Sequence, residues 1–218
     1  MVSTIKRPVV TGLVNLKGNT MSTGAIVFTV VVVLAIVYVI NVYNTLVKLK
    51  NRFQNAFAQI EVQLKRRYDL IPNLVNTAKA YMQHERETLE AVINARNEAM
   101  AGLQAASSQP GGEQAMQKLA GAEKNLAGAL GRMHVVMEAY PELKANQNMM
   151  QLSEQITSTE NKVSFARQGY NDSVMGYNTY RQSFPPVFFA KQFGHSTNAS
   201  LLEFADTAAI QDAPQVNF

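Results

Sequence analysis

The sequence predicts an all-α protein, in which an N-terminal transmembrane helix continues into an antiparallel bundle of about four long helices. Three observations predict this fold class. An uncharged apolar run extends from Gly24 to Tyr43, about the length at which a helix crosses the hydrocarbon core of a bilayer. No Pro or Gly interrupts the chain between Ala25 and Arg67. Beyond the run, apolar residues recur at three- and four-residue steps, as in amphipathic helices.

We expect the apolar run to be retained as a single-pass anchor. The alternative is a cleaved signal peptide, whose apolar region of roughly 7–15 residues precedes a small-residue cleavage site. Here the run is longer and is followed by Asn41-Val42-Tyr43-Asn44. The predicted transmembrane helix contains Gly24, Ile26, Phe28, Leu34, Tyr38 and Tyr43.

Composition divides the chain into four predicted parts. They are a flexible N-terminal extension at 1–23, the transmembrane helix at 24–43, the helical bundle at 44–186 and an aromatic-rich C-terminal tail at 187–218. Translation can start at Met1 or at Met21, and the sequence leaves both open.

Basic residues concentrate next to the predicted membrane. Residues 1–70 hold nine Lys and Arg against two acidic residues, whereas the remainder holds eleven against fourteen. Lys48, Lys50 and Arg52 follow the run directly, where anionic lipid headgroups attract basic side chains. By the positive-inside rule, these residues favour a bundle that faces the cytoplasm. The slightly acidic remainder argues against nucleic acid as a partner.

The residue types leave little material for catalysis. The chain has no Cys, which excludes disulfides, thiolate metal sites and cysteine nucleophiles. His84 precedes Glu85 and Glu87, whereas the di-iron bundle signature places a His three residues after a Glu, twice. A Gly-rich phosphate loop, a Ser elbow and an HExxH motif are all missing. We therefore expect no catalytic residues, no metal site and no cofactor.

Four long helices are expected in the bundle. The first continues from the anchor and ends at 66–69, because Pro72 suits the first turn of the next helix. This second helix ends at the breaker Ser107–Gly112. The third covers about Glu113–Ala139, and the fourth covers about Leu143–Ser183 before a Pro-Pro pair.

Small residues interrupt the third helix. Gly121, Gly128 and Gly131 each cost about 1 kcal/mol of helix stability against Ala. The spacing of Gly121 and Gly128 permits the close approach of a neighbouring helix. Together with Ala120 and Ala127, these glycines are candidates for packing between subunits.

Four charged residues fall on or beside the apolar stripes: Glu85 and Arg96 on the second helix, and Glu160 and Arg167 on the fourth. A buried charge without a partner is costly, so opposite charges on facing stripes suggest cross-helix pairs. One hypothesis is an interhelical polar network, with Glu85 or Glu160 facing Arg96 or Arg167. The alternative, in which each side chain reaches water from the stripe edge, stays open.

Methionines and aromatic residues give further expectations. We expect the Met-rich middle of the chain to fill the core, through Met116, Met133, Met137, Met149 and Met150. An aromatic series on the fourth helix is expected to pack against the first helix, and its members are Phe165, Tyr170, Tyr177, Tyr180 and Phe184. The aromatic-rich tail either folds back over the core or leaves a hydrophobic patch for a partner or a lipid surface.

Two motifs resemble those of a known family. VQLKRRYDLIPNLV at Val62–Val75 and AYPELKAN at Ala139–Asn146 are similar to parts of the two signature blocks of the LemA family, and the resemblance covers about Val42–Phe204. It implies an anchored bundle of long antiparallel helices at the bacterial inner membrane, without an accepted enzymatic activity. Some members carry a lipidated Cys before the Tyr-Asn pair, which would place their bundle outside the cytoplasm, whereas this chain has Asn41 and Val42 there. A magnetosome-membrane relative hints at work on membrane organisation.

The leading functional hypothesis is a non-enzymatic, membrane-anchored helical scaffold that self-associates as a homo-oligomer or organises partners at the lipid bilayer. An accessory subunit or adaptor of a membrane enzyme, such as a protease, is the alternative. A metal- or ligand-binding bundle is a third hypothesis. The expected partners are the bilayer, further copies of the chain and a membrane protein.

Overall fold

The computed structural model describes residues 22–204. The chain divides into two compact units, residues 1–40 and 41–218. Residues 1–21 of the predicted extension and residues 205–218 of the predicted tail lie outside the described part. The described residues form helices and no strands, which confirms the all-α fold class.

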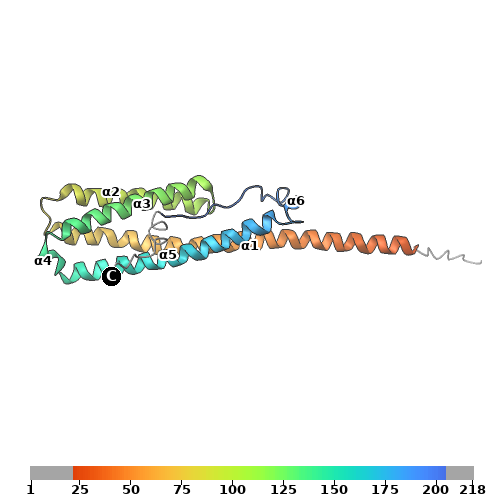
Figure 1. The fold of residues 1–218 in the computed structure, drawn as a ribbon, viewed down its shortest axis with the longest axis horizontal. Coiled ribbons are helices and arrows are strands. Elements are labelled where there is room, and N and C mark those ends of the chain that lie inside the picture. Colours follow the sequence, from red (N-terminus) through yellow and green to blue (C-terminus); the bar gives the residue numbers. More distant parts are fainter. Residues whose placement is uncertain (1–21, 205–218) are drawn as a thin grey trace, which may run out of the picture. The chain divides into compact units, whose positions relative to one another are not determined.

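Four long helices and two short ones make up the described chain (Figure 1). Within the bundle, consecutive long helices run in opposite directions, as predicted (Figure 1). In chain order the helices are α1 (Thr23–Lys79), α2 (Arg86–Ser108), α3 (Glu113–Met137), α4 (Pro141–Lys144), α5 (Gln147–Gln182) and α6 (Val187–Ala190).

Helix boundaries agree with the sequence in the second half of the chain and differ in the first. The predicted third helix corresponds to α3, and the predicted fourth helix is split into α4 and α5. Asn146 separates these two, and its side-chain oxygen caps α5 by accepting a hydrogen bond from the backbone N–H of Met149 at 3.1 Å. The predicted break at 66–69 is wrong, because α1 continues through Pro72 to Lys79.

The continuation through Pro72 is explained by a contact with α2. Proline has no N–H, so the carbonyl of Tyr68, four residues earlier, loses its partner in the helix. The Nε of Arg96 on α2 donates a hydrogen bond to this carbonyl oxygen at 2.7 Å. An arginine from the neighbouring helix therefore replaces the missing N–H, and α1 passes the proline without ending.

Aromatic rings join α1 to α5 in the core of the bundle. The ring of Tyr170 lies 6.4 Å from that of Phe53 and 5.7 Å from that of Phe57, and Tyr177 lies 5.2 Å from Phe53. These contacts confirm the predicted packing for Tyr170 and Tyr177. The same prediction is wrong for Phe165, whose side chain points outward and is 81% exposed.

Methionines fill the core as expected, with one exception. Met116, Met133, Met137 and Met149 are buried. Met150, the neighbour of Met149, is exposed. A helix turns by about 100° from one residue to the next, and this turn takes the Met150 side chain away from the core that buries Met149.

Among the glycines within the described helices, the closest approach occurs at a residue that the sequence did not single out. A Cβ added to Gly102 of α2 would lie 3.2 Å from the Cα of Leu119 on α3. By contrast, a Cβ on Gly121 or Gly131 would meet nothing within 4 Å, and one on Gly128 only a flexible arginine tip at 4.0 Å. The predicted approach at Gly121 and Gly128 therefore does not occur within the described chain.

The tail folds back over the bundle and also leaves aromatic residues exposed. Ala190, Ala199 and Leu202 are buried in the core cluster. Gly111, in the turn between α2 and α3, has φ +84°, and a Cβ there would lie 3.0 Å from that of Ala199. Phe188 is exposed. The described part of the tail thus folds back over the core, and a hydrophobic patch for a partner or a lipid surface stays a prediction.

Candidate interaction surface and buried polar cluster

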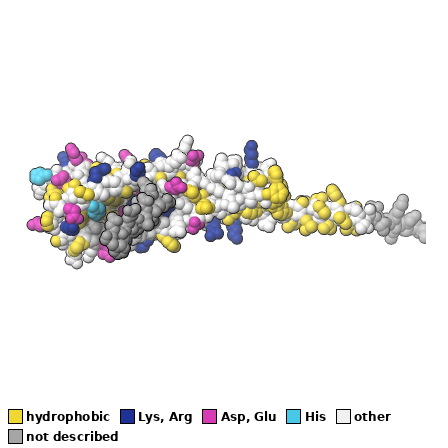
Figure 2. Space-filling view, viewed as in Figure 1, with side chains coloured by type: hydrophobic (Ala, Val, Ile, Leu, Met, Phe, Trp, Pro, Cys, Tyr) yellow, Lys and Arg dark blue, Asp and Glu magenta, His cyan; other side chains and the backbone are white. Residues whose placement is uncertain are grey.

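The N-terminal part of α1 is apolar and uncovered. An 18-residue window there has a mean hydropathy of 2.9, and 6% of the window is buried. By length and composition this helix can cross a membrane. A core helix of a soluble domain passes the same test but is mostly buried, so the exposure argues against a core helix, whereas a signal sequence near the N-terminus passes the test as well. Figure 2 shows hydrophobic side chains along this segment.

The residues predicted for the transmembrane helix all belong to α1 and are exposed: Gly24, Ile26, Phe28, Leu34, Tyr38 and Tyr43. The predicted membrane-proximal basic residues follow on the same helix. Lys48, Lys50 and Arg52 are exposed as well, so their charges are available to lipid headgroups.

A buried polar cluster joins α1 to α3. The Arg67 guanidinium forms an ion pair with the Glu123 carboxylate, and the Tyr68 hydroxyl donates a hydrogen bond to the same carboxylate. All three residues are buried. Burial raises the pKa of Tyr68, and the charge of Arg67 opposes that shift. A buried charge needs such a partner, because removing one member of the pair leaves the other uncompensated.

The four charged residues of the predicted network have contacts of their own. Glu160 lies 3.9 Å from the Arg67 guanidinium, and Arg96 bonds to the Tyr68 carbonyl. Glu85 accepts a hydrogen bond from the Tyr140 hydroxyl at 3.2 Å.

Arg167 is buried, and its guanidinium lies 4.8 Å from the ring centroid of Phe204. Each of the four charged residues thus has a contact outside its own helix. A network that links the four to one another stays a prediction.

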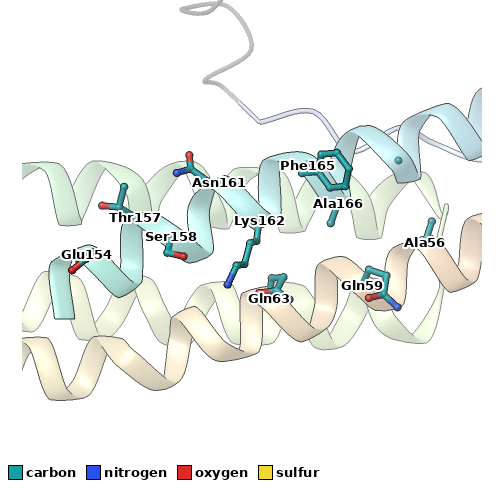
Figure 3. A pocket seen from close by; sticks show the side chains of 11 residues that line it. Ala56, Gln59, Gln63, Glu154, Thr157, Ser158, Asn161, Lys162, Phe165 and Ala166 are labelled. Carbon is teal, nitrogen blue, oxygen red and sulfur yellow. The ribbon is translucent and has the colours of Figure 1, made fainter. Parts of the chain in front are cut away.

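An open groove runs between α1 and α5 (Figure 3). Its volume is about 870 Å³, and apolar atoms make up most of its exposed lining, although most of the lining residues are polar. Ala56 on α1 and Ala166 and Gly169 on α5 keep part of it open, because their side chains are small. Phe165 also lines the groove and is 81% exposed. A ring of this size in water marks a surface with unused hydrophobic area.

Charged and polar side chains on α5 line the groove beside its apolar part. Glu154 and Lys162 lie eight residues apart on α5, with Ser158 midway between them, and all three line the groove (Figure 3). The Oε1 atom of Gln63, across the groove on α1, is buried and accepts no hydrogen bond among the described residues. An unpaired buried acceptor costs free energy, and its burial keeps this oxygen out of reach of an occupant unless the Gln63 side chain moves.

Among residues 22–204, His, Asp and Glu side chains form no group of three or more that could hold a metal ion. The candidate surfaces of this part of the chain are the apolar helix, the groove and the exposed Phe188 of the tail.

Comparison with known proteins places the chain in a family. The sequence profile of the LemA family matches residues 56–218. The chain belongs to the LemA family. This result confirms the resemblance of the motifs at Val62–Val75 and Ala139–Asn146, and the match includes all of the groove.

Two relatives of this LemA chain are magnetosome proteins of Paramagnetospirillum magneticum, MamQ 1 and MamQ 2. Each is 25% identical to it over 166 residues. The alignments cover 68% of this chain, and the chain spans about 60% of the length of each relative.

Sequence reasoning missed the ion pair between Arg67 and Glu123. Arg67 lies on the stripe of α1, three residues after Leu64, and this periodicity could have marked it as buried. Instead the run Lys65-Arg66-Arg67 looked like the basic end of a helix. The groove was missed as well. Its residues are mostly small or polar, and no pattern in the sequence shows that they line one surface, because this surface forms only where α1 packs beside α5.

Proposed function

We propose that this chain is a non-enzymatic, single-pass membrane-anchored scaffold that self-associates through the groove between α1 and α5. The observation that carries the proposal is the exposed Phe165 beside that open, mainly apolar groove. Membership of the LemA family and the uncovered apolar helix support attachment to a membrane. Neither the LemA family nor MamQ is a known enzyme family, which supports a non-enzymatic role.

A second copy of the chain is the proposed occupant of the groove. In a two-fold interface the same patch meets itself, so each residue faces its counterpart across the axis. Because α1 anchors both copies in the same bilayer, their α5 helices would run in the same direction, and Ser158 of one copy would face Ser158 of the other near the axis. The exposed Phe165 would be covered in the same interface, where aromatic side chains contribute most to binding.

The bacterial inner membrane is the proposed location, with the bundle in the cytoplasm. Lys48, Lys50 and Arg52 support that side by the positive-inside rule. Because these side chains are exposed, they would also be attracted to anionic headgroups.

The mass of the full chain in lipid nanodiscs tests self-association. We expect the wild type to be a dimer or a larger oligomer. F165D should convert it to a monomer, because the carboxylate would have to be buried in an apolar interface. V135D is the matched control, because Val135 on α3 is also exposed and apolar but lies outside the groove. It should keep the mass of the wild type.

A like charge at the axis tests the proposed two-fold arrangement within the same experiment. S158K should weaken the oligomer, because it brings two like charges together across the axis. An S158K chain with the mass of the wild type would contradict the two-fold arrangement, and a monomeric wild type would contradict self-association itself.

An adaptor of a membrane enzyme remains the alternative function, and the groove gives it a specific form. A photocrosslinker placed at position 165 of the full chain in its membrane would capture the occupant. Capture of a second copy supports the scaffold. Capture of one recurrent membrane enzyme in its place would overturn it in favour of the adaptor.

A further inference from the structure

Three exposed apolar residues lie together around α6. Phe184 precedes the helix, and Val187 and Phe188 belong to it, with 79%, 46% and 63% of their surfaces exposed. The rings of Phe184 and Phe188 meet edge to face, with centroids 5.9 Å apart. This aromatic patch covers no part of the core, so its hydrophobic area is free for another occupant.

The aromatic patch is tied to the end of the predicted transmembrane helix. The ring of Phe193 lies 5.3 Å from that of Tyr43, and Phe189 stacks on Phe193 at 6.2 Å. Tyr43 is the last residue of the apolar run. A segment that contacts this residue stands at the level where α1 leaves the hydrocarbon core, and aromatic side chains concentrate at that level in membrane proteins.

Hydrogen bonds hold the segment after α6 on α5. The side-chain amide of Asn178 exchanges two hydrogen bonds with the backbone of Ala199, both at 2.9 Å. Asn171, two turns earlier, does the same with Leu202 at 2.9 and 3.2 Å. A third contact joins the Tyr177 hydroxyl to Nδ1 of His195 at 3.0 Å. Residues 195–202 are therefore held on α5, and the patch has a defined place on the bundle.

The charge around the patch is basic. Residues 183–202 contain no Asp or Glu, and Lys191 directly follows α6. Lys50 and Arg181 lie close enough to His195 to lower its pKa, after the larger effect of burial. Figure 2 shows hydrophobic side chains at this end of the bundle, with Lys and Arg side chains beside them. An apolar patch within basic charge matches the surface of an anionic bilayer.

We propose that Phe184, Val187 and Phe188 insert into the interface of the anionic bilayer that anchors the chain. This second membrane contact is independent of the transmembrane helix and of the groove. It would hold the end of the bundle against the lipid surface instead of leaving it attached by one helix alone.

The test uses tryptophan as a depth reporter, because the chain contains no native Trp. F184W and F188W would be placed separately in the full chain, in nanodiscs of anionic lipid with or without brominated acyl chains. We expect brominated lipid to quench both fluorophores at least twofold, and we expect weak quenching by aqueous acrylamide. F165W is the matched control, since Phe165 is equally exposed on α5 but lies at the groove. Brominated lipid should leave it unchanged.

Two results would overturn the proposal. If acrylamide quenches F184W and F188W strongly and brominated lipid does not, the patch faces water. If neither agent quenches them, a second copy or another protein covers the patch. Adding F165D to the F188W chain separates this proposal from the proposed scaffold. F165D should abolish self-association, whereas brominated lipid should still quench the tryptophan at position 188.

Discussion

Pro72 and Arg96 are coupled through one backbone carbonyl. The proline removes the helical partner of the Tyr68 carbonyl, and the Arg96 Nε supplies a replacement at 2.7 Å. Tyr68 is almost fully buried, so water cannot take over this role without opening the bundle. A buried carbonyl left without a donor costs about 1–3 kcal/mol. The bond therefore explains both a helix that tolerates proline and a charged side chain beside an apolar stripe.

Replacing Arg96 by methionine tests this coupling. R96M keeps the apolar stem but removes the donor, so the free energy of unfolding should fall by about 1–3 kcal/mol. In a P72A background the backbone N–H of residue 72 can bond to the Tyr68 carbonyl, and the cost of R96M should fall by about 1 kcal/mol or more. Urea unfolding of the four chains in mild detergent, followed by circular dichroism, gives both costs. Equal costs in the two backgrounds would show that the arginine acts elsewhere.

The helices were largely predictable, whereas one junction between them was not. Periodicity and the Pro110-Gly111-Gly112 breaker located the end of α2 and the beginning of α3, because these are local signals. The continuation of α1 through Pro72 depends instead on Arg96, which is distant in sequence. The helix ends only between Lys79 and Arg86, in a stretch without Pro or Gly. Local sequence signals therefore predicted neither this end nor the continuation through Pro72.

Glycine positions in α2 and α3 give a prediction at the level of the helix pair. G102L should destabilise the bundle by about 1–3 kcal/mol, because its side chain would be forced against the Leu119 backbone. G121A should stabilise it by about 0.5–1 kcal/mol, since alanine favours the helix and its Cβ would meet nothing within 4 Å. Thermal unfolding of both variants measures the difference. If G121A lowered the melting temperature in the assembled protein, a neighbouring copy would be packed on α3 after all.

At the scale of the whole molecule, the sequence predicted a membrane anchor but did not predict which residues of the bundle form exposed apolar surface. The uncharged run and the basic residues after it predicted an anchored helix, and the family match and exposed apolar segment fit membrane anchoring. The surface of the bundle could not be predicted in the same way. Phe165 fits the helical spacing of an aromatic core series, and only the packing of α5 on α1 shows that its ring faces outward.

Cysteine crosslinking in the membrane tests the central claim of self-association most directly. The chain has no Cys, so a single S158C substitution places one thiol close to the proposed two-fold axis. N125C is the control, because Asn125 is exposed on α3 beside Gly121 and Gly128. Under mild oxidation, our account predicts that S158C forms a disulfide-linked dimer and that N125C stays monomeric. A dimer from N125C and none from S158C would contradict it.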